Sequence, residues 1–170
     1  MREKGFTLVE LMIVVVIVGV LAVVAIFSIR KFMAAGRKSE VYAMFGEIRA
    51  KEEAYHAEFS AYASTTNSEA IFYPVPNGTP QTWAPPLVFT QIGINPGKNQ
   101  VYCGYNVIAG ARGSMAGMGA RGTAWFGNAA PLTDWWYANA SCDNDRNPAI
   151  NALYITSNTN TAVNEQNPQN

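Results

Sequence analysis

The feature that most constrains this chain is an apolar run near its start. The segment from Phe6 to Ile29 is 24 residues long, and its only charged residue is Glu10. As an α-helix it would be about 36 Å long, which is enough to cross the hydrocarbon core of a bilayer. A cleaved secretory signal would have a shorter apolar core, with small residues at its cleavage site. Here Arg30 and Lys31 follow the run directly, so we expect a retained membrane anchor.

Beyond the anchor, the composition predicts one small folded domain. The chain has 170 residues and a formal net charge of zero, and 14% of its residues are charged. Most of the basic residues precede position 52, and the remainder is rich in Asn, Thr, Gly, Pro, Tyr and Trp. Because no basic surface is evident, nucleic acid is not an expected partner. The aromatic content and low charge instead indicate a packed domain with a neutral surface.

Two observations disagree about the side of the membrane on which this domain lies. The positive-inside rule compares Arg2 and Lys4 with the four basic residues at 30–38, and it favours a cytoplasmic domain. The cysteines Cys103 and Cys142 and the neutral composition favour an oxidising compartment. A disulfide between them would close a loop of about 40 residues and stabilise the fold by about 4 kcal/mol. Two free buried thiols are the alternative.

The N-terminal segment resolves this conflict through a resemblance. Residues 4–11 read KGFTLVEL and lead into the apolar run. A short basic leader that ends in Gly5, an aromatic residue at Phe6 and an acid at Glu10 together resemble the start of type IV pilins and pseudopilins. The resemblance implies that a prepilin peptidase cuts between Gly5 and Phe6 and methylates the new terminus of Phe6. It also implies a single-pass inner-membrane protein with a periplasmic domain, which moves to a cell-surface pilus on assembly.

The same resemblance gives Glu10 a role in assembly. An ionised carboxylate within hydrocarbon costs roughly 2–3 kcal/mol even on lenient insertion scales. In a bundle of anchors, Glu10 would meet the terminal ammonium of a neighbouring Phe6, so that each charge compensates the other. The implied partners are other pilin or pseudopilin subunits, the prepilin peptidase, an inner-membrane assembly platform and, before assembly, the membrane. The alternative is that Glu10 only lies near the headgroups at the start of the span.

The pattern after the anchor predicts that the helix continues. No proline precedes Pro74, so one helix can run from residue 6 to 62, with an anchor at 6–29 and an amphipathic continuation at 30–62. Apolar residues recur in the continuation at spacings of 3, 4 or 7, which is typical of a helix that buries one face. They are Val41, Met44, Phe45, Ile48, Tyr55, Phe59 and Tyr62.

The rest of the chain predicts a small antiparallel sheet, so the expected fold class is α+β. A β-rich domain at 63–157 would pack its sheet against the amphipathic half of the helix. Strand-like runs follow a proline-rich loop, at 87–94, 100–109, 123–126, 134–140 and 153–157. We expect a disordered tail at 158–170, because its composition is polar, and a cleaved leader at 1–5.

Two further places carry weaker signals. Asp143, Asp145 and Asn147 present oxygens at alternating positions, as a calcium loop does, but the central Gly and the closing Glu are absent. A solvated turn is the simpler interpretation. His56, the only histidine, lies among glutamates on the polar side of the predicted helix. Neither a catalytic triad nor a metal site can be built on it, so we expect an ordinary surface residue.

Adjacent tryptophans mark a candidate interface. Successive side chains of a strand point to opposite faces, so at least one of Trp135 and Trp136 should point outward. An exposed tryptophan would suit contact with a neighbouring subunit, because aromatic residues often anchor interfaces. The alternative is that these residues belong to the core of the domain.

Together these features predict a structural subunit, and neither an enzyme nor a protein with a cofactor. The main hypothesis is a type IV pilin, of the minor class, that primes or enters a pilus used in twitching motility, adhesion or DNA uptake. Many fibre-forming pilins have proline at the position of Phe27, and its absence favours a minor subunit. The alternatives are a pseudopilin of a type II secretion system and a membrane-anchored enzyme or binding domain that forms no fibre.

Overall fold

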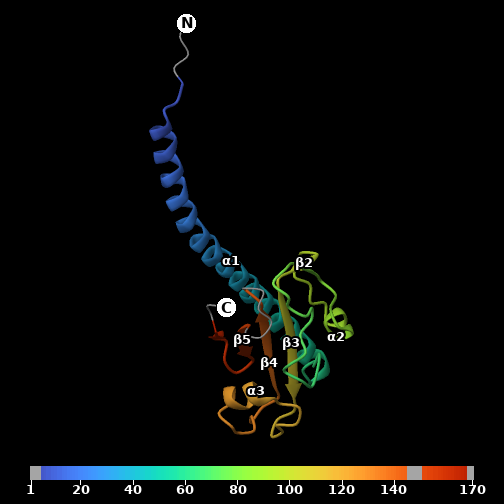
Figure 1. Ribbon diagram of the computed structural model, residues 1–170. Coiled ribbons are helices and arrows are strands. Elements are labelled where there is room, and N and C mark those ends of the chain that lie inside the picture. The colour runs from blue at the N-terminus through green and yellow to red at the C-terminus, as the bar shows by residue number, and fades with distance from the viewer. Residues whose placement is uncertain (1–4, 145–150, 168–170) are drawn as a thin grey trace. The chain divides into compact units, whose positions relative to one another are not determined.

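The computed structural model describes residues 5–144 and 151–167 and has an α+β architecture, as predicted (Figure 1). Its main elements are one long helix and one four-stranded antiparallel sheet with the strand order β3-β4-β5-β6. The helices are α1 (Leu8–Phe59), α2 (Leu87–Gln91) and α3 (Ala120–Trp125). The strands are β1 (Gln81–Thr82), β2 (Gln100–Val101), β3 (Cys103–Gly110), β4 (Trp135–Cys142), β5 (Ala152–Ser157) and β6 (Asn164–Gln166), and β1 and β2 pair separately.

The chain divides into two compact units, at 1–36 and 37–170, and α1 contributes to both. The first unit contains the apolar part of α1. Within the described part of the chain, α1 is the one helix long and apolar enough to cross a membrane, judged by length and composition. The second unit contains the rest of α1 and both sheets. The boundary after Gly36 lies beyond position 29, where the sequence pattern placed the end of the anchor.

The C-terminal half of α1 packs on one face of the sheet, as its periodicity predicted. Val41, Met44, Phe45 and Ile48 are each at most 3% exposed and join a core with apolar residues of β3, β4 and β5. Phe59, however, is 56% exposed, so the buried stripe stops before the last turn. The helix ends at Phe59 and not at Tyr62, because the next residue, Ser60, adopts a left-handed backbone with φ of 53°.

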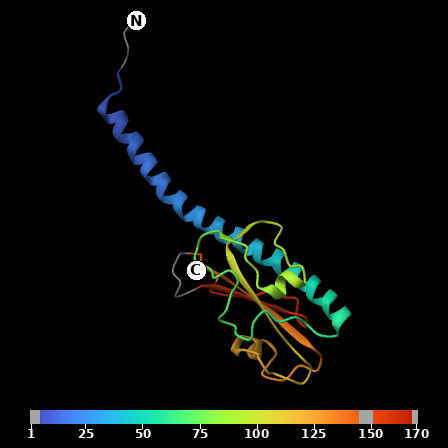
Figure 2. The same ribbon diagram turned by 90° about the vertical axis from the view of Figure 1, so that its right-hand side faces the viewer.

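The second face of the sheet is also covered, which the sequence pattern did not predict. Figure 2 shows the sheet between α1 on one side and α3 on the other. Trp135, Tyr137 and Ile155 form a smaller core there with residues of the α3 region. Segment 123–126 was expected to be a strand, but it lies mostly in α3, and 87–94 contains α2. Short apolar runs do not distinguish a strand from one or two helical turns, which explains both errors.

The sheet reaches further along the chain than predicted. Residues 164–166 form β6 and pair with β5, so the tail expected to be disordered includes an edge strand. Glu165 of β6 binds the ammonium of Lys38 and accepts a hydrogen bond from the Tyr154 hydroxyl at 3.0 Å. At the opposite edge, Thr65 donates its N–H to the carbonyl of Val107 at 2.9 Å, so the loop after α1 covers β3. Polar contacts with other parts of the chain therefore hold in place segments whose composition predicted no ordered structure.

Candidate functional site

The first turn of α1 is closed by a reciprocal pair of hydrogen bonds between Thr7 and Glu10. The Thr7 backbone N–H donates to Glu10 Oε2 at 2.9 Å, and the Glu10 N–H donates to Thr7 Oγ1 at 3.3 Å. The Thr7 hydroxyl also donates to Glu10 Oε2, at 2.8 Å. Since α1 begins at Leu8, Thr7 is its N-cap and Glu10 its third residue, which is the arrangement of a capping box. The Thr-x-x-Glu spacing in the sequence carries this signal, although the cap was not among the predicted features.

The capping box gives Glu10 a partner within its own chain. Glu10 is exposed, and its carboxylate already accepts two hydrogen bonds from Thr7. A carboxylate in the first turn also lies favourably in the field of the helix dipole. Glu10 is therefore compensated before any second subunit binds. An intermolecular pair with a neighbouring ammonium would have to replace or share these bonds.

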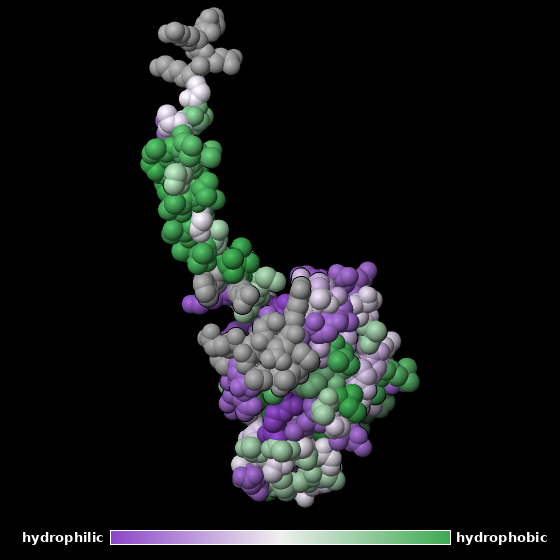
Figure 3. Space-filling model, viewed as in Figure 1, coloured by the Kyte–Doolittle hydropathy of each residue, from purple (hydrophilic) through white to green (hydrophobic). Residues whose placement is uncertain are grey.

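The N-terminal part of α1 presents apolar side chains on all sides. From Phe6 to Ile26, every large apolar side chain is at least 53% exposed, and Phe6 itself is 85% exposed. Figure 3 shows these side chains gathered over the N-terminal part of α1. A helix that is apolar all round must be covered by lipid or by other helices. This segment is consequently the main candidate for an interaction surface in the described chain.

The predicted processing site precedes this helix. Gly5 and Phe6 lie before the first residue of α1, outside any regular element, and both are exposed. A peptide bond in such a segment is accessible to a protease, whereas one within the helix would require unwinding. The leader residues before Gly5 lie outside the described residues. The geometry is thus compatible with cleavage between Gly5 and Phe6, which stays a prediction.

The predicted disulfide is present and joins two neighbouring strands. Cys103 of β3 and Cys142 of β4 lie directly opposite each other in the antiparallel register, with their Cα atoms 4.4 Å apart. Both residues are fully buried beneath α1. The bond therefore closes the long β3–β4 connection at the end where β3 begins and β4 ends.

Charged side chains on α1 fasten the helix to the sheet. The Glu40 carboxylate accepts hydrogen bonds from the Tyr102 N–H at 3.0 Å, the Cys103 N–H at 3.2 Å and the Tyr105 hydroxyl at 2.9 Å. Burial, together with the nearby Glu40 charge, raises the pKa of Tyr105, so its hydroxyl remains a donor. Glu40 therefore holds the start of β3, which includes Cys103 of the disulfide, against the middle of α1.

Arg37 makes a similar attachment at the residues proposed as a calcium loop. Its guanidinium donates to the carbonyl oxygens of Asp143 and Gly78 and to Asn144 Oδ1 at 3.2 Å. A cationic group thus already occupies oxygens at the start of that loop. Of the three candidate ligands only Asp143 is described, and it is 2% exposed. Asp145 and Asn147 lie outside the described residues, and the described part of the chain contains no group of three acidic, His or Cys side chains placed to hold a metal.

Neither tryptophan of the candidate interface faces solvent. Trp135 and Trp136 are both fully buried, on opposite faces of β4. The expectation that one would point outward is wrong, because helices and loops cover both faces of the sheet. The Trp135 indole N–H donates to the carbonyls of Ala111 and Ser114, at 3.1 and 2.9 Å. These residues therefore belong to the core of the domain.

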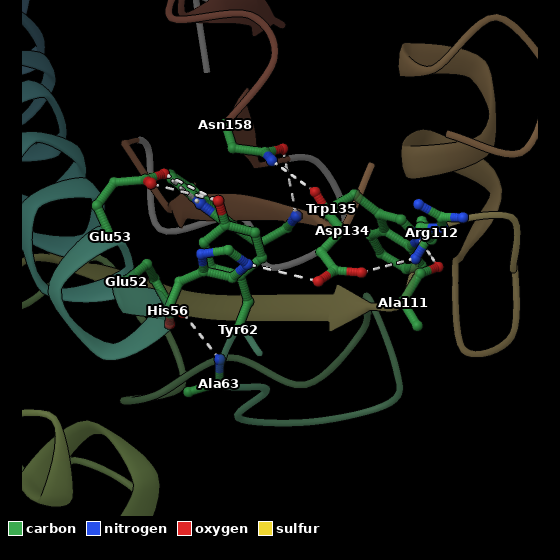
Figure 4. Close-up of polar contacts among 11 residues, drawn as sticks. Glu52, Glu53, His56, Tyr62, Ala63, Ala111, Arg112, Asp134, Trp135 and Asn158 are labelled. Atoms are coloured by element: carbon green, nitrogen blue, oxygen red, sulfur yellow. Dashed lines mark hydrogen bonds and ion pairs between the residues drawn. The ribbon is translucent and has the colours of Figure 1, made fainter. Parts of the chain in front are cut away.

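His56 is not an ordinary surface residue but part of a polar cluster at the end of α1. We define the terminal polar cluster as Glu52, Glu53, His56, Tyr62 and Asp134, which Figure 4 shows around the end of the helix. His56 Nε2 lies 3.4 Å from Asp134 Oδ2, and its ring stacks on Tyr62 with the centroids 4.3 Å apart. Asp134 comes from the segment before β4, so sequence spacing along α1 could not reveal this contact.

Comparisons with known proteins agree with the N-terminal features. The family model described as "Prokaryotic N-terminal methylation motif" matches residues 1–26. The chain is 38% identical over 66 residues to the type IV major pilin protein PilA of Myxococcus xanthus, covering 39% of this chain and 30% of that protein. It is 47% identical over 47 residues to the type IV major fimbrial protein FimA of Dichelobacter nodosus, covering 28% of this chain and 30% of FimA.

A third relative is the fimbrial protein EcpC of Eikenella corrodens, which is 30% identical over 69 residues, or 41% of this chain and 45% of that protein. The matched region thus spans less than half the length of each of these relatives. No solved structure matches the chain. The similarity to these pilins and fimbrial proteins consequently extends over less than half of this chain as well.

Proposed function

We propose that the chain is a type IV pilin-like structural subunit that polymerises through its N-terminal helix into a pilus. The observation that carries the proposal is the exposed apolar surface of α1, which has Glu10 in its first turn. Such a surface is stable in a bilayer and equally in a bundle of like helices. The relatives named above are themselves major pilins and fimbrial proteins, which supports the same function here.

In this proposal, processing and assembly use two neighbouring groups. A prepilin peptidase would free and methylate the amino group of Phe6 on the cytoplasmic side of the inner membrane. Glu10 of an incoming subunit would then exchange its bonds to Thr7 for the ammonium of Phe6 on a neighbour. Because a charge pair in a dry bundle is far less costly than one unpaired charge, this exchange favours one axial register. The assembly platform and the other subunits are the remaining partners.

We further propose a minor position in the fibre, on the basis of Phe27. Proline at that position, present in many fibre-forming pilins, would ease local unwinding of the helix. The named relatives include major subunits, so abundance in the fibre is the quantity that decides. A pseudopilin would share the N-terminal features. A calcium loop would favour it, and two of the candidate ligands, Asp145 and Asn147, lie outside the described residues.

The proposal is tested by mass spectrometry of fibres sheared from cells, compared with the membrane fraction. We expect an N-terminal peptide that begins at methylated Phe6, at low abundance relative to a major pilin. Glu10→Ala should remove the chain from the fibre fraction while its domain stays folded and disulfide-bonded. Glu58→Ala, which changes an exposed acid at the other end of α1, is the matched control and should leave incorporation unchanged. An intact leader on a chain that is absent from fibres would refute the proposal.

A further inference from the structure

Glu52 is a buried acid with an incomplete set of partners. It is fully buried in the terminal polar cluster, and its Oε2 atom accepts the Ala63 N–H at 2.9 Å. Its Oε1 atom is buried and has no hydrogen-bond partner within the described residues. A buried carboxylate normally needs several donors to stay ionised at low cost. Burial, as the largest cause, and the nearby Glu53 raise the pKa of Glu52 to about 7.

His56 lies one helical turn after Glu52 and contacts a different part of the chain. Its Nε2 atom is 3.4 Å from Asp134 Oδ2, so a proton on the imidazole converts this contact into an ion pair. The pKa of Asp134 is lowered, first by the hydrogen bond from the Arg112 backbone N–H and then by the bond with His56. Asp134 therefore stays ionised at neutral and mildly acidic pH.

The other charged and titratable groups around these two residues act in the same direction or are already engaged. On α1, Glu53 accepts hydrogen bonds from the Tyr62 hydroxyl at 3.3 Å and from the Trp136 indole at 3.4 Å. Its negative charge opposes ionisation of Glu52. From the β3–β4 connection, Arg112 reaches Asp134 through its backbone N–H at 2.9 Å. Among the described contacts of Glu52, the only hydrogen-bond donor is the Ala63 amide, and no cation pairs with it (Figure 4).

We propose that the last two turns of α1 form a latch that a proton strengthens, through uptake at Glu52. A proton on Glu52 removes a buried charge and leaves an oxygen to accept the Ala63 N–H. This contact holds the segment that follows α1, while the contact between His56 and Asp134 holds the residues that precede β4. Mild acidification therefore tightens the attachment at Glu52, and alkaline conditions loosen it. This inference concerns the folded domain and is independent of fibre formation.

The sign follows from the proton balance of the folded and open states. With Glu52 exposed to water, its pKa returns to about 4.5, whereas it is about 7 when buried. Opening therefore releases a proton between these two values, and protection of the contact falls as pH rises through the window. For local opening that exposes Glu52, these values give about tenfold less protection of the Ala63 amide at pH 8 than at pH 6.

The test is hydrogen exchange of the full chain in detergent micelles, followed at the Ala63 amide between pH 5.5 and 8.5. Protection factors remove the intrinsic pH dependence of exchange. We expect Ala63 protection to fall with pH in the wild type and to be nearly constant in Glu52→Gln, which keeps an acceptor oxygen but cannot ionise. Glu58→Gln, an exposed acid of the same helix, should behave like the wild type.

Two results would overturn the proposal. One is the same pH dependence of Ala63 protection in Glu52→Gln and the wild type; the other is protection that rises with pH. A second, independent test needs no variant. The carboxyl carbon of Glu52, observed by NMR in the wild-type chain, should titrate near neutrality. Titration near pH 4.5, as for an exposed glutamate, would refute the proton uptake on which the latch depends.

Discussion

Replacing Glu40 with alanine tests whether buried polar contacts, and not only apolar packing, hold α1 on the sheet. The substitution removes the acceptor for three donors at the start of β3, two of which belong to the fully buried residues Cys103 and Tyr105. A buried donor left without a partner costs about 1–3 kcal/mol. Two such donors give an expected loss of about 4 kcal/mol in the free energy of unfolding.

A second substitution separates this cause from lost packing. Tyr105→Phe removes one of the two buried donors, so it should cost less in the Glu40→Ala background than in the wild type. The difference between the two backgrounds should be about 1–2 kcal/mol. In the Glu40→Ala background, Tyr105→Phe removes a buried hydroxyl that already lacks its acceptor, whereas in the wild type it removes a satisfied donor. Glu47→Ala is the matched control on the same helix. Glu47 accepts one exposed N–H, from Asn95, and its loss should cost less than about 1 kcal/mol.

The assay is urea unfolding of the full chain at constant detergent concentration and pH, followed by tryptophan fluorescence, to which the buried Trp135 and Trp136 contribute. The midpoint should move to lower urea while the slope stays the same, since the exposed surface hardly changes. A loss below about 1 kcal/mol for Glu40→Ala would refute the role assigned to the buried donors. Equal costs of Tyr105→Phe in both backgrounds would refute it independently.

Three further predictions concern other parts of the fold. Replacing both residues of the Cys103–Cys142 pair with alanine should lower the free energy of unfolding by about 4 kcal/mol in the same assay, because the bond closes a loop of about 40 residues; an unchanged midpoint would contradict this. A Cβ atom at Gly104 would lie 2.1 Å from the Pro74 carbonyl oxygen, so Gly104→Ala should lower the free energy of unfolding by about 1–3 kcal/mol. Gly46 has open space around it, so Gly46→Ala should be neutral or stabilising. Equal effects of the two substitutions would count against the close approach at Gly104. Thr7→Ala should speed amide exchange in the first turn of α1 by removing a cap worth about 1 kcal/mol, and Thr7→Ser should not; equal exchange in both variants would argue against the capping box.

Features that depend on one stretch of chain could be predicted from the sequence. The length and purity of the apolar run determine that α1 must be covered by lipid or by other helices. The periodicity of Val41, Met44, Phe45 and Ile48 determines which face of the helix is buried. The Thr-x-x-Glu spacing at Thr7 also determines a local cap, although a capping box was recognised only in the structure. Each of these is a one-dimensional pattern with a local physical cause.

The remaining features were decided only when distant segments came together. Trp136 and Trp135 are both buried because α1 covers one face of β4, and α3 and its loops cover the other. His56 meets Asp134 because the chain returns to the end of α1 after 78 residues, and the buried Glu52 binds the Ala63 amide of the segment that follows the helix. A charged residue on a helix has the same sequence signature whether it faces solvent or a backbone amide. Burial depends on the neighbours that the tertiary fold supplies, and hence only the folded structure could identify Glu52 as an internal group.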